Sequence, residues 1–392
     1  MSGVTKHIFE REISEIKKMW NDQLKTLLMV LPKGYTHEDI VALLHEYYPH
    51  EWDSVEIKYS YYQIKDKHIM KRFGKSRYNM KKPEDLLKET YLYKKIISFG
   101  YQRQYNDNFN NEIYITEREH LRKKRNPKIE RINQKIMNAK SKTQQVTPIF
   151  LDKLIGLYER KRTTQKDKCY ILIELKKYYT PKIIMFFFKL NDTEMNRQLR
   201  TDAFHHLQEF NYHPRLRKQK YMQKHIKNKK RKMELRNIYA YQETKIKFDP
   251  DELEYRIRNS KEQQIKEFDY FISHSSRDSR TVQKLINYEN GNGKNIFCDW
   301  ISDVDYLKRN LLCEATLRVI EFRLQQSNAL IYVMSENSLN SVWCNYELNY
   351  YFELGKPIYI IKKERIEIGD YELSLLEDNW FINPDYKSIP PV

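Results

Sequence analysis

Trp343 and Glu347 stand four positions apart in the segment NSVWCNYEL. On an α-helix, side chains four residues apart lie on the same face, so an indole and a carboxylate would be neighbours. A fixed carboxylate in a site that excludes water stabilises positive charge that develops on a bound molecule. If this helix borders a crevice, the pair predicts an aromatic wall with one acid group beside it.

Other side chains that could contact a ligand directly follow short apolar runs of the kind that form buried strands. In open α/β sheets, ligands bind outside the carboxyl ends of the strands, so these side chains are expected at the rim of any site. A strand-terminal Asp or Ser is also a common helix cap or turn residue, which is the structural alternative for Asp299 and Ser335. The rim residues are Ser273 and His274 after the first run, Asp299 and Trp300 after the second, and Ser335 after the third.

The elements that would position these residues alternate between strands and helices from about residue 268 onward. Several short apolar strands, each followed by a helix, imply an α/β fold with a parallel sheet covered on both faces. The predicted strands are 269–273, 295–299, 329–335 and 357–361. The predicted helices include one through Leu311, Leu317, Ile320 and Leu324, and one from about Ser341 to Leu354.

The motifs in this region resemble those of the TIR (Toll/interleukin-1 receptor) domain family. FDYFISHSSRDS, IFCDW, RLQQSNALIYVMSENS and NSVWCNYEL are similar to its successive motifs over about 118 residues, some 30% of the chain. CDW and the segment around Arg323 are closer to bacterial stand-alone TIR enzymes than to animal receptor tails. The resemblance implies a flavodoxin-like parallel sheet. One departure is the loop WISDVDYLKRN, which lacks the Gly or Pro usual there and leaves the mode of TIR self-association open.

Catalytic TIR domains cleave NAD+ with one glutamate in a W-x-x-x-E element, which Trp343 and Glu347 match. The resemblance therefore implies NAD+ as the substrate, Glu347 as the catalytic residue, and no metal or other cofactor. Breaking the nicotinamide–ribose bond builds positive charge on the ribose, as in glycoside hydrolysis, and the cationic nicotinamide needs no proton in order to leave. The residues expected to contact the substrate are Phe271, Ser273, His274, Asp299, Trp300, Arg323, Ser335 and Trp343.

A similar motif occurs in receptor TIR domains that are adaptors without recognised activity. Under that alternative, Trp343 is a core anchor and Glu347 is a surface or interface charge. Arg323 could meet a phosphate, or it could be an ordinary exposed helix arginine. Cys298 and Cys344 are expected to be small buried hydrophobic residues.

The chain before the α/β region is predicted to be mainly helical. The full chain of 392 residues has a length that suits two domains. Thr36 followed by Asp39 predicts a capping box at the start of a helix. Residues 117–143 are so charged that they form either a long exposed helix or a poorly ordered connector. We predict a basic helical region at 1–248 that senses a signal or binds a partner, a helical linker at 249–266 and a TIR domain at 267–392.

The formal charge of +18 is unevenly divided along the chain. From Phe268 onward there are 13 basic and 18 acidic residues, which leaves 58 basic and 35 acidic residues before it, so the two parts carry −5 and +23. A basic balance of this size attracts polyanions such as nucleic acid, but it carries no specificity. The run KHIKNKKRK, within residues 215–236, is either a solvated helix face or a polyanion contact.

The cysteines and the apolar segments bear on the protein's environment. Cys169, Cys298, Cys313 and Cys344 lie far apart with no C-x-x-C pair, which argues against a structural zinc site or a disulfide framework. The first residues, MSGVTKHIFERE, contain no apolar signal core, and the most apolar run, 183–188, is far shorter than the roughly 20 residues that span a bilayer. We expect a cytoplasmic protein that does not bind membranes.

The two parts together predict a sensor joined to an effector, similar to bacterial TIR proteins of antiphage defence. The basic region would bind nucleic acid or a protein partner and bring TIR domains together, so that NAD+ is hydrolysed or cyclised. One rival hypothesis is a TIR scaffold without turnover. The other is a nucleic-acid-binding protein whose TIR domain processes nucleic acid. The sequence does not choose between hydrolysis and cyclisation.

Overall fold

The computed structural model describes residues 4–213, 228–230, 233, 243–307 and 312–376. The chain divides into two compact units. The first comprises residues 1–137, 191–193 and 203–237, and the second comprises residues 138–190, 194–202 and 238–392.

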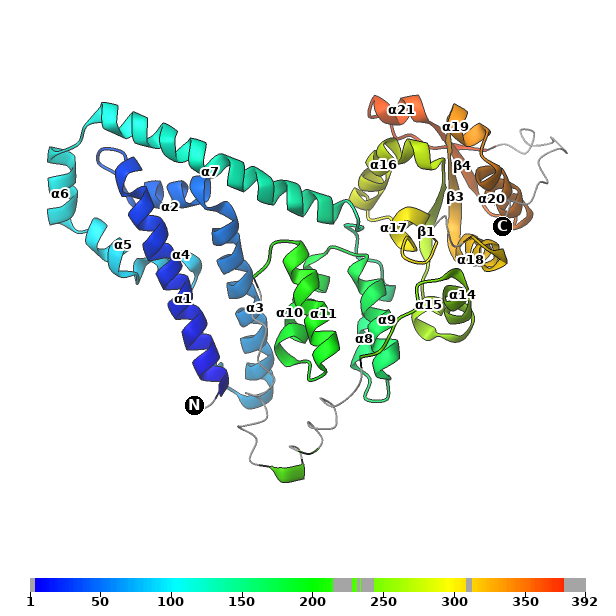
Figure 1. The fold of residues 1–392 in the computed structure, drawn as a ribbon, viewed down its shortest axis with the longest axis horizontal. Coiled ribbons are helices and arrows are strands. Elements are labelled where there is room, and N and C mark those ends of the chain that lie inside the picture. The colour runs from blue at the N-terminus through cyan, green and yellow to red at the C-terminus, as the bar shows by residue number, and fades with distance from the viewer. Residues whose placement is uncertain (1–3, 214–227, 231–232, 234–242, 308–311, 377–392) are drawn as a thin grey trace. The chain divides into compact units, whose positions relative to one another are not determined.

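The described elements of the first unit are helical (Figure 1). Its core contains Trp20 and Trp52, whose ring centroids are 5.7 Å apart. The predicted capping box is confirmed, because Thr36 and Asp39 each bond the other's backbone amide. The highly charged residues 117–140 lie in one long helix, α7 (Asn111–Lys140), so the first alternative for 117–143 holds for most of that segment. The helices are α1 (Val4–Leu27), the 3₁₀ helix η1 (Leu28–Val30), α2 (His37–Tyr47), α3 (Pro49–Phe73), α4 (Pro83–Lys88), α5 (Tyr91–Ile96), α6 (Phe99–Asp107) and α7 (Asn111–Lys140).

The second unit includes helices that the predicted boundaries leave outside the TIR domain. Leu253 and Ile257 of α14 share a buried apolar cluster with Tyr170 of α9 and Val319 of α18. Residues 249–266 include the helices α14 and α15, and α14 packs within this unit. The helices upstream of the sheet are α8 (Phe150–Glu159), α9 (Gln165–Lys176), α10 (Pro181–Thr193), α11 (Arg197–Glu209), α14 (Pro250–Asn259) and α15 (Lys261–Gln264), of which α10 and α11 end in the first unit.

The sheet has the strand order β2-β1-β3-β4-β5. The first four strands are parallel, as predicted, and β5 is an antiparallel edge strand that the sequence pattern did not indicate. This order is that of flavodoxin-like folds, whose switch point lies between β1 and β3. The strands are β1 (Phe268–Ser273), β2 (Ile296–Phe297), β3 (Ser327–Met334), β4 (Ile358–Lys362) and β5 (Ser374–Leu375).

Helices cover both faces of the sheet (Figure 1). Leu285 of α16 and Ile366 of α21 pack on one face, and Leu324 of α18 and Leu348 of α20 pack on the other. The predicted helix through Leu311 is α18, which begins at Glu314, and Leu311 itself lies outside the described residues. The remaining helices are η2 (Ser276–Asp278), α16 (Ser279–Gly291), α17 (Asp299–Ser302), α18 (Glu314–Gln325), α19 (Glu336–Leu339), α20 (Val342–Glu353) and α21 (Lys363–Glu367).

Two further expectations concern cysteines and membranes. The four cysteines all lie within the described residues and are free, and Cys298 and Cys344 are buried as expected. Among the described residues, no helix combines the length and the apolar character needed to cross a lipid bilayer.

Candidate active site

Helix α20 presents the predicted pair to a cavity. Ser341 caps the helix by accepting a hydrogen bond from the amide of Cys344 at 3.3 Å. Trp343 in the first turn of this helix and Glu347 one turn later both line a cavity of about 400 Å³. The local i, i+4 spacing therefore places the indole and the carboxyl group at one hollow.

The carboxyl group of Glu347 is held by the end of β1. The Ser273 hydroxyl donates a hydrogen bond to Glu347 Oε2 at 2.6 Å. Burial raises the pKa of Glu347 to about 8, and the nearby Asp299 carboxylate adds to the rise, whereas the Ser273 hydrogen bond acts against it. Near neutral pH the free protein therefore holds a proton on this group.

Most of the other predicted contact residues lie at the same end of the sheet. Phe271, His274 and Asp299 line the cavity with Glu347. A second hollow of about 420 Å³ shares His274 and Asp299, and Trp300 lines it. The Trp300 indole donates a hydrogen bond from Nε1 to His274 Nε2 at 3.0 Å, which fixes the two rings relative to each other.

Ser273 and Ser335 are placed differently from the other predicted contact residues. The described linings of the two hollows do not include them, and both are buried. Ser273 positions Glu347 instead of facing the cavity. Ser335 caps α19 through the amide of Ser338 at 3.1 Å and donates to Asp278 Oδ2 at 2.6 Å, as its structural alternative predicts, and a substrate contact of Ser335 stays a prediction.

Arg323 lies apart from the other predicted contact residues. Its side chain is fully buried, so the alternative of an exposed helix arginine is wrong, and its contact with a phosphate stays a prediction. Nε donates to Asp303 Oδ2 at 2.7 Å and Nη2 donates to Gln263 Oε1 at 2.7 Å. The sequence pattern could not reveal this burial, because both partners come from other elements of the fold.

Two features of the site were missed by the sequence analysis. Leu307 and Ile320 contribute apolar side chains to the cavity lining. Asp278 is buried and joins two strand ends, since it accepts hydrogen bonds from Ser335 and from Asn337 Nδ2 at 2.9 Å. The Ser335 bond, the Lys363 ammonium group at 3.0 Å and the Asn337 bond hold the pKa of Asp278 below its usual range despite burial. The only signal for Asp278 was its place in the turn SSRD.

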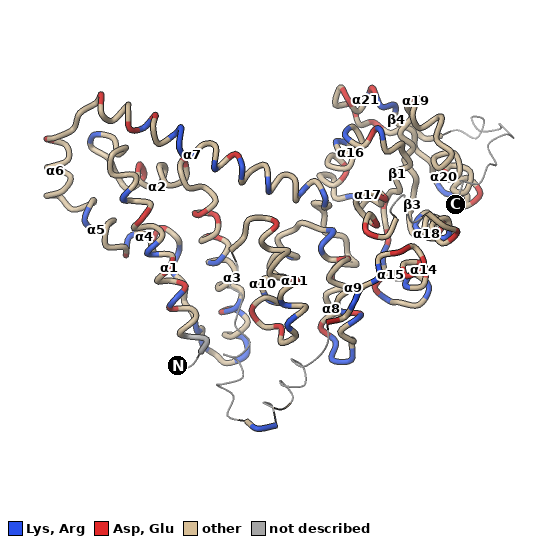
Figure 2. Tube along the Cα trace, viewed as in Figure 1, with Lys and Arg blue, Asp and Glu red and all other residues tan. Residues whose placement is uncertain are grey.

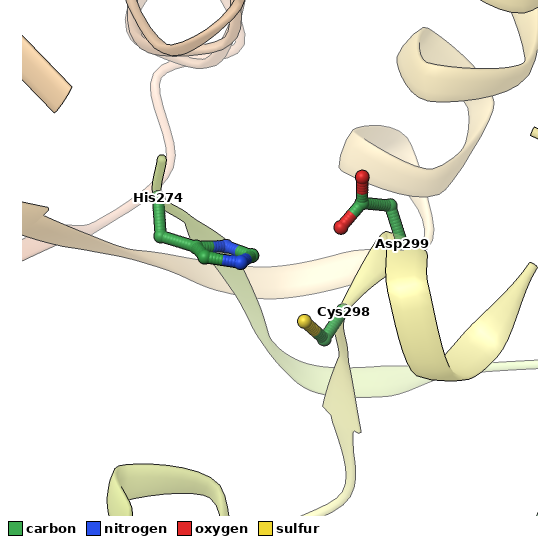
Figure 3. Close-up of side chains that lie close together, drawn as sticks. All are labelled: His274, Cys298 and Asp299. Atoms are coloured by element: carbon green, nitrogen blue, oxygen red, sulfur yellow. The ribbon is translucent and has the colours of Figure 1, made fainter. Parts of the chain in front are cut away.

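His274, Cys298 and Asp299 form a cluster that could in principle hold a metal (Figure 3). Their potential ligand atoms lie within 4.8 Å of one another. However, His274 Nε2 accepts the Trp300 hydrogen bond, and Nδ1 lies 3.3 Å from the Ile272 carbonyl, to which it can only donate. Burial and Asp299 raise the pKa of the Cys298 thiol well above its usual value, so the thiolate that binds metals is disfavoured. As the cluster stands in the structure, protein groups contact both ring nitrogens of His274.

Comparisons with known proteins identify the family. Residues 271–367 match the family model described as "Thoeris protein ThsB, TIR-like domain". A protein of Cytobacillus dafuensis named "Putative cyclic ADP-D-ribose synthase TIR2" is 34% identical over 361 residues, which cover 92% of each chain. The chain is a ThsB-type TIR protein. This ThsB-type protein is also 33% identical over 109 residues to the "Probable 3' cyclic ADP-D-ribose synthase ThsB'" of Bacillus cereus (strain MSX-D12), covering 28% of this chain and 55% of that one.

No solved structure matches this ThsB-type protein. The match to the family model begins within β1, so it includes only the end of that strand and all of β2, β3 and β4. Helices α8, α9, α14 and α15 lie outside the matched range, although they belong to the same compact unit as the sheet. The domain that carries the site is therefore larger than the family match.

Proposed function

We propose that the protein consumes NAD+ and that Glu347 acts at its nicotinamide–ribose bond. The observation that carries the proposal is the carboxyl group of Glu347 beside Trp343 in a cavity of about 400 Å³. This volume is within the range of about 300–1,000 Å³ that is typical of small-molecule sites. The names of the two relatives, both cyclic ADP-D-ribose synthases, support the same substrate.

The chemistry needs a single acid residue. When the bond between nicotinamide and ribose C1′ breaks, both electrons leave with the nicotinamide, which becomes neutral, and the ribose becomes an oxocarbenium-like cation. An ionised Glu347 stabilises that cation in a site with little water. The positive nicotinamide ring of bound NAD+ lowers the pKa of the nearby carboxyl group and so favours its ionised form.

We infer that the product is a cyclic ADP-ribose, because both relatives are named for that activity. In cyclisation, a nucleophilic atom of the same ADP-ribose forms the new bond to C1′ and gives up its proton. In hydrolysis, a water molecule takes that place. Mass spectrometry distinguishes the products, since the cyclic form is lighter by one water.

The second hollow is proposed to take the ADP half of the dinucleotide. It adjoins the Glu347 cavity, with which it shares His274 and Asp299. Arg280 contributes a guanidinium group, which suits a pyrophosphate, and Trp300 contributes an indole, on which a base can stack. The first cavity would then hold the nicotinamide riboside half.

The test measures nicotinamide and nucleotide products from the full-length protein, both purified and in expressing cells. We expect Glu347→Gln to lower nicotinamide release on the order of 100-fold or more, as loss of one transition-state contact does. Glu353→Gln is the matched control, because Glu353 is exposed on the same helix, and it should keep the wild-type rate. Equal release from the wild type and Glu347→Gln contradicts the proposal.

The biological role follows as a proposal from the family. We propose an effector of Thoeris antiphage defence, in which the TIR domains self-associate and the upstream helical region binds the activating partner. The rival scaffold without turnover predicts no nicotinamide release in cells that show the defence phenotype. The rival nucleic-acid-processing enzyme predicts degraded nucleic acid and unchanged NAD+ in those cells.

A further inference from the structure

Asp303 connects two walls of the Glu347 cavity through its backbone. Its amide donates to the carbonyl of Asp299 at 3.0 Å. Its own carbonyl accepts from the amides of Tyr306 and Leu307 at 2.9 and 3.0 Å. Asp299 and Leu307 both line the cavity, so any displacement of Asp303 moves residues on two sides of the site.

The side chain of Asp303 is held by three buried or nearly buried cations. Arg323 donates to it at 2.7 Å from Nε and at 3.4 Å from Nη2. Lys177 Nζ lies 3.2 Å from Oδ1, and Lys266 Nζ lies 3.9 Å from the same atom. These cations keep the pKa of Asp303 well below its usual range despite complete burial, with Arg323 the strongest of them.

A second carboxylate completes the cluster from helix α9. Glu174 pairs with Lys177 at 2.8 Å and with Lys266 at 2.7 Å. Gln263 of α15 links the halves, because its amide donates to Glu174 at 2.8 Å while its oxygen accepts from Arg323 at 2.7 Å. We call these residues the Asp303 cluster: Glu174, Lys177, Gln263, Lys266, Asp303 and Arg323.

The cluster is better suited to fixing positions than to adding stability. The cost of removing charges from water offsets most of the attraction between them, so a buried ion pair is weak evidence for stability. Its directional bonds nevertheless define where each member lies. Four members of the cluster precede residue 271, where the match to the TIR family model begins: Glu174, Lys177, Gln263 and Lys266. The position of Asp303 is therefore set in part by residues outside that match.

We propose that Asp303 is a positioning residue for the active site, and that helix α9 sets the catalytic geometry through the Asp303 cluster. The proposal rests on the proposed cleavage of NAD+ at the Glu347 cavity. Glu174 of α9 and Lys177, which directly follows α9, thus connect the helices upstream of the sheet to the site through Asp303. Movement of α9 shifts Lys177 and Glu174, and with them the cavity walls at Asp299 and Leu307.

The test compares Asp303→Asn with Glu262→Gln in the full-length protein. Glu262 is also buried and pairs with Arg256 at 2.5 Å in the same unit, but it does not line the cavity. Each change removes one buried carboxylate charge with little change in shape. Both variants are expected to lower the melting temperature, whereas only Asp303→Asn is expected to lower kcat/KM, by about tenfold or more, because small misplacements in an active site are costly.

A second pair of variants covers the case in which Asp303→Asn does not fold. Lys177→Met is expected to lower kcat/KM in the same direction as Asp303→Asn, and Lys177→Arg, which keeps the charge, is expected to restore it at least in part. A folded Lys177→Met protein with wild-type kcat and KM would overturn the proposal, whether or not Asp303→Asn folds.

Hydrogen exchange separates failure of this proposal from failure of the proposed activity. Amides of residues 299–307 are expected to exchange faster in Asp303→Asn than in the wild type, with no such change in Glu262→Gln. This readout needs no turnover, so it remains decisive if Glu347→Gln shows that the protein does not cleave NAD+. Unchanged exchange at 299–307 in Asp303→Asn also overturns the positioning role.

Discussion

At the scale of single residues, the ionisation of Glu347 controls the proposed reaction. Burial raises its pKa from 4.5 to about 8. Between pH 4.5 and about 8, the folded state therefore keeps a proton on Glu347 that the unfolded state has released. The contribution of this group to stability is largest below the unfolded pKa and is lost as pH rises to about 8. Activity has the opposite trend, because the ionised carboxylate stabilises the ribose cation.

The expected outcome is a kcat/KM that rises about tenfold per pH unit below about pH 8 and levels off above it, since kcat/KM reports the free enzyme. The profile of kcat should level off at a lower pH, because the bound nicotinamide cation favours the ionised group. Steady-state kinetics between about pH 6 and 9 measure both profiles. Glu347→Gln should lack the inflection, and a flat wild-type profile would refute the role of this ionisation.

At the scale of elements, one buried carboxylate fixes the chain that follows α3. Asp66 accepts hydrogen bonds from the amides of Arg77 at 2.8 Å, Tyr78 at 2.9 Å and Asn79 at 2.7 Å. The segment therefore needs no strand or helix partner for these amides. Asn79 has a φ of 47°, a left-handed conformation that Asn tolerates better than most residues.

We expect Asp66→Ala to lower the free energy of unfolding by about 3 kcal/mol, because three amides lose a charged acceptor in a buried setting. Asp22→Ala is the control, since Asp22 is exposed and its pair with Lys25 is a surface ion pair. That change should cost less than about 0.5 kcal/mol. Urea unfolding followed by circular dichroism measures both, and equal costs would show that the Asp66 bonds add nothing.

At the scale of the whole molecule, part of the basic charge is neutralised by neighbouring acidic residues. Basic and acidic residues are interspersed along the helices (Figure 2). On α7, Arg122 pairs with Glu46 at 2.9 Å and Arg125 pairs with Glu51 at 3.1 Å. The most basic run, KHIKNKKRK, lies largely outside the described residues, so the two interpretations of it remain predictions.

Binding to a single-stranded oligonucleotide tests the basic region. We expect affinity to fall about tenfold or more between 50 and 200 mM salt, because phosphate contacts release counterions. Replacing the exposed α7 residues Lys123, Lys124 and Lys128 by Glu should weaken binding more than the same change at Lys161, Lys284 and Lys362, which are exposed in the second unit. Salt-independent affinity would exclude a polyanion site and favour a protein partner.

The sequence by itself determined the features that depend on local periodicity. Alternating apolar runs predicted the four parallel strands, and the spacing of Trp343 and Glu347 predicted a shared helix face that borders a cavity. The capping box at Thr36 was equally local. Each of these follows from residues within a few positions of one another, where backbone geometry fixes which side chains meet.

Tertiary structure alone decided what the side chains at the site do. Ser273 meets Glu347 across 74 positions, and Lys177 meets Asp303 across 126. Arg323 could be read as an exposed helix arginine until its buried partners were known. The extent of the compact unit that carries the site and the raised pKa of Glu347 also depend on contacts between residues that are distant in the sequence. Burial and charge pairing depend on distances in space, which the fold sets and the order of residues along the chain does not display.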